Sequence, residues 1–321
     1  MPEAIEKEPS AKPIVPWTGG KRRLAGQILP LFPKHICYVE PFAGGAALFF
    51  LKEPSKAEVL NDINGELVNL YRVVKNHLEE FLRQFKWALT SRKIYEWSHA
   101  TPPEVLTDVQ RAARFFYIQR LNFAGLPRSR TYACGTRESR AINLLRIEET
   151  LSAAHLRLSQ ANLESLPWEK CVERYDREET FFYMDPPYLG SSNDYGFDFP
   201  PENYQRMAEL LGTMKGKAIV SLSDCREVRR TFKGFKMRSV SITYTPGAGS
   251  AGKGAKAREL IIRNFWEPPA ARLLLYGPRP PGAPEWPAKA GGTESVPAGS
   301  DSVPMAGKRA GFSIARPGGR G

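Results

Sequence analysis

Cysteine and histidine are both scarce in this sequence of 321 residues, which contains four of each. The cysteines form no C-x-x-C pair and the histidines are dispersed, so the pattern indicates neither a disulfide framework nor a zinc site. We therefore expect free thiols in a reducing compartment and no bound metal. The cysteines are Cys37, Cys134, Cys171 and Cys225.

Long apolar runs are absent as well. No segment approaches the roughly 18 consecutive apolar residues that a bilayer-spanning helix needs. Residues 1–12 are charged and contain proline, which is unlike a signal peptide. These absences predict a soluble, cytoplasmic protein without a membrane partner.

Acidic residues are the smaller charged class, since 34 Asp and Glu stand against 46 Lys and Arg and leave a formal net charge of +12. Such an excess is expected of a protein that approaches a polyanion, either nucleic acid or an acidic membrane surface. Hydrophobic residues make up 42% of the chain. That fraction is enough for one large core, or for a core and a smaller subdomain.

The C-terminal region has too few apolar positions to form a core. Residues 267–321 hold 10 of the 27 glycines and 10 of the 27 prolines, with Tyr276, Trp286 and Phe312 as their aromatic residues. A segment of this composition cannot bury enough apolar surface to offset the entropy of folding. The sequence therefore predicts a disordered tail.

Within residues 13–266, short apolar runs end in polar clusters and are followed by helical periodicity, which is typical of a doubly wound α/β sheet. The predicted strands are His35–Val39, Ala57–Leu60, Phe181–Met184, Ala218–Leu222 and Leu260–Arg263. The predicted helices are Ala46–Leu51, Leu67–Phe85, Ala112–Leu121 and Tyr204–Met214. Residues 85–168 are mostly helical or loop with no strong strand, so we expect a helical insertion between sheet segments 13–84 and 169–266.

A glycine-containing segment, Glu40-Pro41-Phe42-Ala43-Gly44-Gly45, lies between a predicted strand and a predicted helix. Glycine at such a turn lets the backbone approach a ligand closely. The spacing fails the dinucleotide fingerprint G-x-G-x-x-G, and Glu40 would repel a pyrophosphate. Asp62 ends the next strand, where an acidic side chain can accept hydrogen bonds from ribose hydroxyls.

Glu40 and Asp62 together favour a nucleoside with a cationic tail, such as S-adenosylmethionine. An equally weighted alternative is that both are helix caps and the glycines form a tight turn. Upstream, Gly20-Lys21 superficially suggests a phosphate loop, but Val15 and Arg22 do not match the P-loop pattern. This comparison excludes a P-loop ATPase.

Two residues near that segment have both a functional and a structural interpretation. Lys21 would pair with a carboxylate or a phosphate, and Trp17 would stack on a ring. Alternatively, Lys21 is a surface lysine and Trp17 a core tryptophan.

A buried strand is predicted to end in Asp185-Pro186-Pro187-Tyr188. The prolines stiffen the turn, so that the Asp185 carboxylate and the Pro186 carbonyl can face outward as fixed acceptors. Two acceptors on the hydrogens of adenine's amino group would free its nitrogen lone pair for attack on a sulfonium methyl. Tyr188 would stack on a base flipped out of the duplex. A Pro-Pro turn followed by a packed tyrosine is the weaker alternative.

Taken together, these motifs resemble the Dam-type family of DNA adenine methyltransferases, in the class whose cofactor motif precedes the catalytic motif. The resemblance rests on Trp17-Thr18-Gly19-Gly20-Lys21, the glycine segment from Glu40, Asp62-Ile63-Asn64 and Asp185-Pro186-Pro187-Tyr188, and it covers about residues 14–265. It implies a Rossmann-like methyltransferase sheet, with residues 85–168 as the target-recognition region.

The resemblance also implies roles for individual residues. S-adenosylmethionine would contact Trp17, Lys21, Asp62 and Asp185. Further candidate cofactor residues, from the glycine segment itself, are Glu40, Phe42 and Gly44. Catalysis would involve Asp185, Pro186, Pro187 and Tyr188. Two departures from the family pattern are Ala124, where asparagine is common, and the run from Ser221 to Asp224, where relatives carry a Ser-Asn-His-like sequence.

Basic residues crowd part of the predicted insertion, in a composition suited to phosphate contacts interleaved with base-edge readers. The candidate DNA-binding residues are Arg120, Arg128, Arg130 and Arg137; Arg140, Arg146, Asn122, Tyr132 and Thr136 share this stretch. A solvated basic surface is the alternative for any single arginine. The glycine-rich segment Thr245–Lys256 is a second basic loop that could order on a DNA backbone.

The predicted activity is methylation of the exocyclic amino nitrogen of adenine in double-stranded DNA, in a bacterial or phage-infected cytoplasm, with a monomer sufficient for the reaction. One alternative is the same chemistry on cytosine or on RNA. Another is a catalytically silent DNA-binding regulator of the same fold. The pattern does not define the target sequence or the restriction, phage or regulatory context, because base specificity depends on which side chains reach which edges.

Overall fold

A computed structural model describes residues 11–266, and its described residues belong to one compact unit. Internal gaps in this description are Thr18, Gly20, Trp87, residues 123–124, 126–129, 134–143, 190–196, Asp198 and residues 244–255. The predicted tail, Arg128, Arg137 and nearly all of the glycine-rich basic loop therefore lie outside the described residues, as does Ala124.

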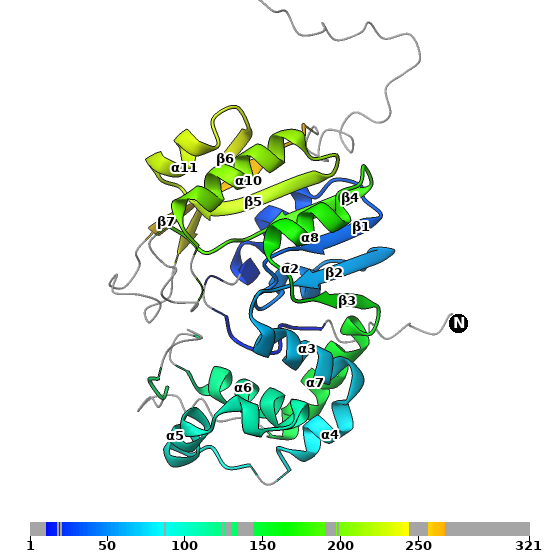
Figure 1. The fold of residues 1–321 in the computed structure, drawn as a ribbon, viewed down its shortest axis with the longest axis vertical. Helices are drawn as coiled ribbons and strands as arrows, with labels where there is room; N and C mark the ends of the chain where they lie inside the picture. Colours follow the sequence, from blue (N-terminus) through cyan, green and yellow to red (C-terminus); the bar gives the residue numbers. More distant parts are fainter. Residues whose placement is uncertain are drawn as a thin grey trace, which may run out of the picture. The chain divides into compact units, whose positions relative to one another are not determined.

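Seven strands form one sheet in the order β3-β2-β1-β4-β5-β7-β6. The strands are β1 (Cys37–Glu40), β2 (Ala57–Asn61), β3 (Ala161–Glu164), β4 (Thr180–Met184), β5 (Lys217–Ser223), β6 (Lys236–Thr243) and β7 (Lys256–Arg263). The first five are parallel, and β7 runs antiparallel between β5 and β6 (Figure 1). The predicted doubly wound α/β class is confirmed.

The chain reverses its direction of winding between β1 and β4, which are neighbours in the sheet. From β1 it goes outward through β2 to β3, then returns to β4 on the other side of β1. In open parallel sheets, the loops at the carboxyl ends of strands diverge at such a switch point and leave a crevice for ligands. The fold therefore predicts a site at the ends of β1 and β4.

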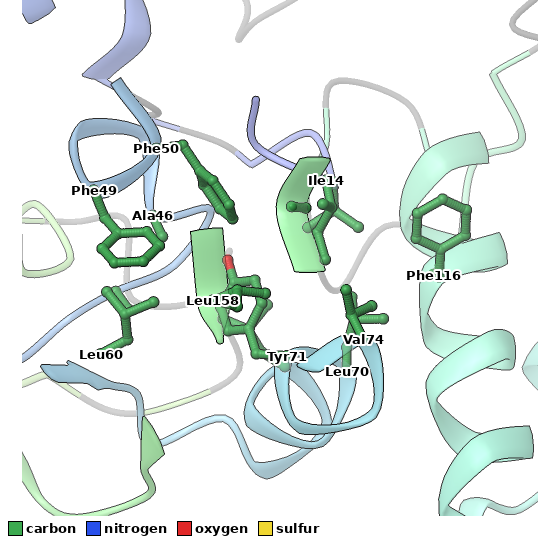
Figure 2. Packing of buried hydrophobic residues seen from close by; sticks show 14 of the residues in the cluster. Ile14, Ala46, Phe49, Phe50, Leu60, Leu70, Tyr71, Val74, Phe116 and Leu158 are labelled. Atoms are coloured by element: carbon green, nitrogen blue, oxygen red, sulfur yellow. The ribbon is translucent and has the colours of Figure 1, made fainter. Parts of the chain in front are cut away.

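Alternating side chains of the strands divide the core into two clusters, one on each face of the sheet. In β4, Phe181 and Tyr183 join the cluster that includes helices α2 (Ala47–Leu51) and α3 (Gly65–Asn76), whereas Phe182 and Met184 join the other. Figure 2 shows Phe49, Leu60 and Tyr71 packed in the first cluster. The second cluster is covered by α8 (Trp168–Tyr175), α10 (Pro201–Thr213) and α11 (Arg226–Thr231).

A group of helices packs beside the first face of the sheet through α3 (Figure 1). Its members are α4 (Leu78–Arg83), α5 (Arg92–Ala100), α6 (Asp108–Leu121) and α7 (Leu144–Leu158), with a short 3-10 helix η3 (Pro103–Val105) between α5 and α6. α6 begins with a capping box in which Thr107 and Gln110 bond each other's backbone N–H groups, which stabilises its first turn. These helices agree with the predicted helical character up to residue 158, but β3 lies inside the predicted insertion of residues 85–168 and belongs to the sheet.

Three details differ from the sequence-based expectation. The single helix expected over residues 67–85 is two helices, α3 and α4, which meet at His77. Two strands were missed. β3 has only four residues, one of them fully buried. β6 lies at the edge of the sheet, and polar residues interrupt its apolar ones. Neither strand contains the continuous apolar run on which the prediction relied.

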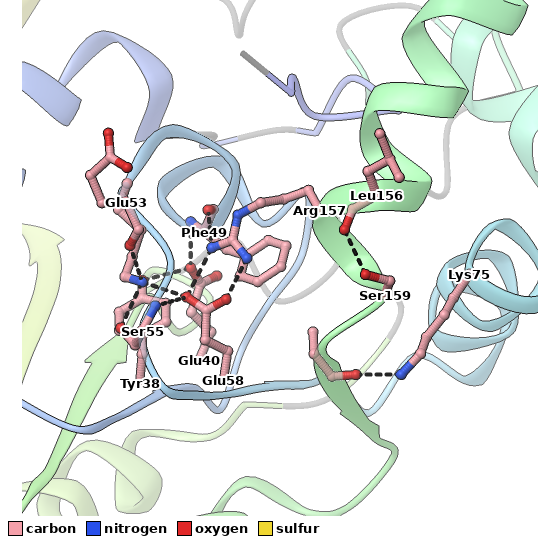
Figure 3. A network of polar contacts seen from close by, with 12 residues as sticks. Tyr38, Glu40, Phe49, Glu53, Ser55, Glu58, Lys75, Leu156, Arg157 and Ser159 are labelled. Atoms are coloured by element: carbon pink, nitrogen blue, oxygen red, sulfur yellow. Dashed lines mark hydrogen bonds and ion pairs between the residues drawn. The ribbon is translucent and has the colours of Figure 1, made fainter. Parts of the chain in front are cut away.

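A buried ion-pair network ties β2 to α7 across the first face (Figure 3). The Glu58 carboxylate, 2% exposed, accepts hydrogen bonds from the Arg157 guanidinium at 2.8 Å and from the Ser55 N–H at 3.1 Å, and it also pairs with Lys52. Because two cations and a backbone donor contact this carboxylate, they offset the free-energy cost of burying its charge. Burial is the largest influence on the Glu58 pKa and raises it, but the hydrogen bonds from Arg157 and Lys52 outweigh that effect and the pKa is lowered.

None of the helices among the described residues is long and apolar enough to cross a membrane. The same part of the chain contains no cluster of three or more side chains of the types that hold metal ions.

Candidate active site

Three acidic residues predicted from sequence lie at the carboxyl ends of neighbouring strands. Glu40 is the last residue of β1, Asp62 follows β2 and Asp185 follows β4. The parallel pairing of β1 with both β2 and β4 brings these strand ends to the same edge of the sheet. The switch point is therefore acidic.

The glycine loop between β1 and α2 is held in place from two sides. The Gly44 N–H donates to Asp62 Oδ2 at 2.8 Å, and the Tyr71 hydroxyl donates to the Gly44 carbonyl at 2.6 Å. Gly44 has φ +49°, and a Cβ there would lie 2.7 Å from Trp17 Nε1. Glycine is needed both for this backbone conformation and for the close approach of the Trp17 ring. The structure thus brings together Trp17, Gly44 and Asp62.

Glu40 is almost fully buried, at 2% exposure. Its Oε1 accepts hydrogen bonds from the Tyr38 hydroxyl at 2.7 Å and from the Phe49 N–H at 3.0 Å (Figure 3). Burial raises the pKa of Glu40 to about 8, although these two hydrogen bonds oppose the shift. Burial likewise raises the pKa of Asp62, against the hydrogen bonds from the N–H groups of Asn64 and Gly44. A cation near these carboxylates would favour their charged forms.

Phe42 packs as a core residue on the second face. Its ring stacks on Trp168 with centroids 5.9 Å apart and meets Phe199 edge-on at 5.6 Å. These contacts account for its half-buried position, and the predicted cofactor contact of Phe42 stays a prediction.

The buried Lys21 and the partly exposed Asp185 form an ion pair that joins the N-terminal segment to the end of β4. Lys21, in the 3-10 helix η1 (Lys21–Arg23), is 3% exposed, and its Nζ lies 2.8 Å from Asp185 Oδ1. Burial raises the pKa of Asp185, while Lys21 and a hydrogen bond from Ser221 lower it. The alternative of a surface lysine is wrong, because Lys21 pairs with a carboxylate.

The Tyr188 ring lies beside the ion pair of Lys21 and Asp185. Lys21 Nζ lies 5.0 Å from the centroid of the ring, which is half-buried. The turn that carries Tyr188 is rigid, since Pro186 is buried and the Pro187 carbonyl accepts a hydrogen bond from Tyr204 at 2.5 Å. All four residues of the predicted catalytic motif are therefore held in place at the end of β4.

Ser221 belongs to this site although its segment departs from the family pattern. Its hydroxyl donates to Asp185 Oδ1 at 3.1 Å and bonds the Tyr183 hydroxyl at 2.8 Å. The neighbouring Asp224 instead pairs with Arg229 and Ser239 outside the site. Only the register of β5 beside β4 brings Ser221 to Asp185, and a single sequence contains no signal for that pairing.

Glu259 is a second residue that the sequence did not indicate. It lies on β7, 2% exposed, and its Oε1 is 3.8 Å from Lys21 Nζ. Burial raises the pKa of Glu259, an effect that Lys21 opposes. The sequence around Glu259 has the pattern of an ordinary strand, so no local sequence signal distinguishes Glu259 from a surface residue.

The predicted DNA-binding residues have different environments. Arg130 is exposed, whereas Arg120 lies over the Phe116 ring at 5.6 Å and is partly buried, and burial lowers its pKa. Asn122 is fully buried and its amide oxygen accepts from the Tyr95 hydroxyl, so it is not available as a base-edge reader. That expectation was wrong because the α6 terminus turns Asn122 into the helical group.

Gln119 on α6 joins that group to the segment before Trp17. Its Nε2 donates to the Pro16 carbonyl at 3.1 Å and to the Gly125 carbonyl at 2.8 Å, and the side chain is 1% exposed. These hydrogen bonds connect the predicted DNA-recognition region to the segment that carries Trp17, whose side chain packs against the glycine loop.

Gln119→Leu is expected to weaken cofactor binding. The substitution leaves the buried Gly125 carbonyl without its donor, at about 1–3 kcal/mol, and it releases the partly buried Pro16 carbonyl and hence Trp17. Asn69→Leu is the matched control, because Asn69 is a buried amide that donates to the Asp108 carbonyl without touching the N-terminal segment. Calorimetric titration and thermal unfolding should show both variants destabilised and only Gln119→Leu with a raised dissociation constant. Equal affinities would disprove the link.

A doubly wound sheet with this strand order, acidic strand ends and a glycine loop at the switch point defines a Rossmann-like methyltransferase fold. The chain belongs to the family described as D12 class N6 adenine-specific DNA methyltransferase, which matches residues 17–245. It is accordingly an adenine-specific DNA methyltransferase, and the resemblance to Dam-type enzymes is confirmed.

Similar proteins carry consistent names. The type II methyltransferase M1.LlaDCHI of Lactococcus lactis subsp. cremoris is 30% identical, over 79% of this chain and 95% of its own length. The type II methyltransferase M.CviBI of Paramecium bursaria Chlorella virus NC1A is 27% identical, over 79% of this chain and 100% of its own. A DNA adenine methylase of Haemophilus influenzae is 24% identical, over 81% and 96% respectively.

Proposed function

We propose that the chain transfers a methyl group from S-adenosylmethionine to the N6 nitrogen of an adenine that has been flipped out of double-stranded DNA. The observation that carries the proposal is the ion pair of the buried Lys21 with the partly exposed Asp185 beside Tyr188, at the carboxyl end of β4. This pair puts a fixed acceptor and an aromatic ring next to the switch point, where a cofactor and a base can meet.

The residues at the end of β1 fit a nucleoside with a cationic tail. Gly44 and Gly45 let the Trp17 side chain lie closer to the loop backbone than a side chain at either position would permit. Asp62 uses both carboxylate oxygens to hold backbone N–H groups, and each oxygen retains capacity to accept a ribose hydroxyl. Glu40 lacks a cation within its own hydrogen-bonding set. S-adenosylmethionine supplies, when bound, a methyl group on a positively charged sulfur.

The contribution of Asp185 is to accept a hydrogen bond from the amino group of adenine. That nitrogen is a poor nucleophile while its lone pair is delocalised into the ring, and acceptors on its hydrogens favour the pyramidal geometry. Lys21 and Ser221 hold Asp185 Oδ1, so the carboxylate is kept in one orientation. The Pro186 carbonyl is the proposed second acceptor, and Tyr188 the ring on which the base stacks.

The remaining proposals concern the contacts with DNA, the oligomeric state and the cellular compartment of the reaction. Residues 85–168 are proposed to recognise the target, with Arg120, Arg128, Arg130 and Arg137 on phosphates or bases, and the net charge of +12 supports attraction to DNA. A monomer is proposed to be sufficient for the reaction. The reaction is proposed to occur in the cytoplasm of a bacterium or of a phage host, where such DNA is found.

The test is a methyl-transfer assay with tritiated S-adenosylmethionine on unmethylated double-stranded DNA, single-stranded DNA and RNA. Digestion to nucleosides should place the label in N6-methyladenine from the duplex. Label in cytosine or only in RNA would reject the proposed substrate. Cofactor binding without any transfer would favour the DNA-binding regulator.

The pH dependence of cofactor binding tests the role of Glu40. Since the folded-state pKa of about 8 lies above 4.5, ionisation of Glu40 costs stability, and this cost grows as pH rises between those values. A cation beside Glu40 would relieve it. Stabilisation by S-adenosylmethionine should therefore increase with pH through this window, by about 1.4 kcal/mol for each unit by which the ligand lowers the pKa.

Thermal unfolding at several pH values measures this effect. Adenosine, which has no cationic tail, is the control ligand, and Glu40→Gln retains only the titration of the ligand and of the other site carboxylates, Asp62 and Asp185. The same pH dependence in Glu40→Gln as in the wild type would exclude Glu40 as the responsive group.

A further inference from the structure

Glu259 occupies an unusual position for a glutamate. It lies in β7, opposite Ser223 of β5 and Val240 of β6, in the interior of the sheet. A carboxylate that is 2% exposed is costly unless it is paired. Its nearest cationic partner is Lys21, with Nζ 3.8 Å from Oε1, and Lys21 is already bound to Asp185 at 2.8 Å.

The chain contains a contrasting carboxylate that serves only structure. Glu58, also on a strand and 2% exposed, is satisfied by Arg157, Lys52 and the Ser55 N–H. Glu259 and Asp185 instead share one ammonium group. Ser221 also donates to Asp185, which is 21% exposed, and Tyr188 is a hydrogen-bonding neighbour of Glu259. One ammonium group nevertheless serves two carboxylates, whereas Glu58 has two cations to itself, so the charge of Glu259 is less completely balanced and the arrangement points to a role in the reaction.

The arrangement also has a direct effect on Asp185. A lysine that pairs with one carboxylate alone neutralises it and weakens it as an acceptor, whereas a second carboxylate draws the ammonium away and adds negative charge. The titratable groups near Asp185 and Glu259 come from several elements. They are Lys21 on η1, Tyr183 on β4, Asp185 and Tyr188 after β4, and Glu40 on β1.

We propose that Glu259 is a positioning residue for methyl transfer, which holds the Lys21 ammonium between two carboxylates so that Asp185 stays a strong acceptor for the adenine amino group. The inference rests on the proposed function of Asp185. Glu259 acts through Lys21 and Asp185 and needs no contact with substrate.

Glu259→Gln keeps the shape of the side chain and removes its charge. Lys21 then pairs with Asp185 alone, so the kcat for DNA methylation should fall, by up to about 10²-fold if the acceptor is displaced or weakened, with little change in the KM for cofactor. The acid limb of the kcat profile should move to lower pH, since the loss of a nearby negative charge lowers the pKa of Asp185. Glu259→Asp should recover part of the rate.

Glu58→Gln is the matched control, because it also removes a buried strand carboxylate. It should lower the melting temperature and leave the pH profile of kcat in place. The proposal is overturned if Glu259→Gln keeps the wild-type kcat and pH profile. It is equally overturned if Glu259→Gln and Glu259→Asp lose stability and activity together with an unshifted profile, as a purely structural residue would.

A measurement without substrate separates this inference from the proposed function. Carboxyl carbon resonances of labelled aspartate, assigned through Asp185→Asn, report the titration of Asp185 in the free enzyme. Glu259→Gln should shift that midpoint to lower pH even if the wild type methylated no adenine. An unchanged midpoint contradicts the role of Glu259, whereas absent methylation by the wild type contradicts the proposed function.

Discussion

Asp185→Asn is expected to lower kcat for adenine methylation by about 10²- to 10³-fold, the usual effect of removing one preorganised electrostatic partner of a reacting group. Asparagine has nearly the same shape, but it loses the charge and presents an amide that donates hydrogen bonds. It also leaves Lys21 with Glu259 as its remaining carboxylate at the site. Single-turnover rates with saturating cofactor and DNA measure the effect on the chemical step.

The control for this variant is Asp224→Asn. Asp224 follows the adjacent strand β5 and pairs with Arg229 at 2.8 Å, so it shares the local setting of Asp185 without its contacts. Its rate should stay close to that of the wild type. A rate for Asp185→Asn within about tenfold of wild type, with the fold intact, would mean that Asp185 is not the acceptor.

The second large effect is expected for Gly44→Ala. An added Cβ would lie 2.7 Å from Trp17 Nε1 and 2.9 Å from its Cδ1, on a residue with φ +49°. The strained backbone should lower the free energy of unfolding by about 1–3 kcal/mol. Displacement of the Trp17 ring should also weaken cofactor binding. Equilibrium titration measures the cofactor affinity, and denaturant unfolding measures the loss of stability.

Gly212→Ala distinguishes this local clash from a general effect of replacing glycine. Gly212 is exposed in α10, and a Cβ there meets no atom within 4 Å. Alanine favours a helix by up to about 1 kcal/mol over glycine, so this variant should be neutral or more stable. Unchanged cofactor affinity in Gly44→Ala would mean that the contact between Gly44 and Trp17 does not shape the cofactor pocket.

Local sequence signals predicted the parts of the site that are continuous in the chain. Short continuous apolar runs identified the buried strands that lead to Glu40 and Asp185, and a glycine or proline pattern after each strand indicated its turn. The boundaries were accurate to a few residues for β1, β2, β4 and β5. These elements were predictable because their hydrophobic pattern and turn chemistry act over short stretches of chain.

The sequence by itself determined that this protein has strands ending in acidic residues, a glycine loop and an Asp-Pro-Pro-Tyr turn. Only the tertiary structure decided which side chains meet there. Sheet order puts Ser221 and Glu259 beside the Asp185 pair, and helix packing buries Asn122 while attaching Gln119 to Pro16. These contacts join residues far apart in the chain, and strand pairing and burial, which bring them together, are properties of the whole core.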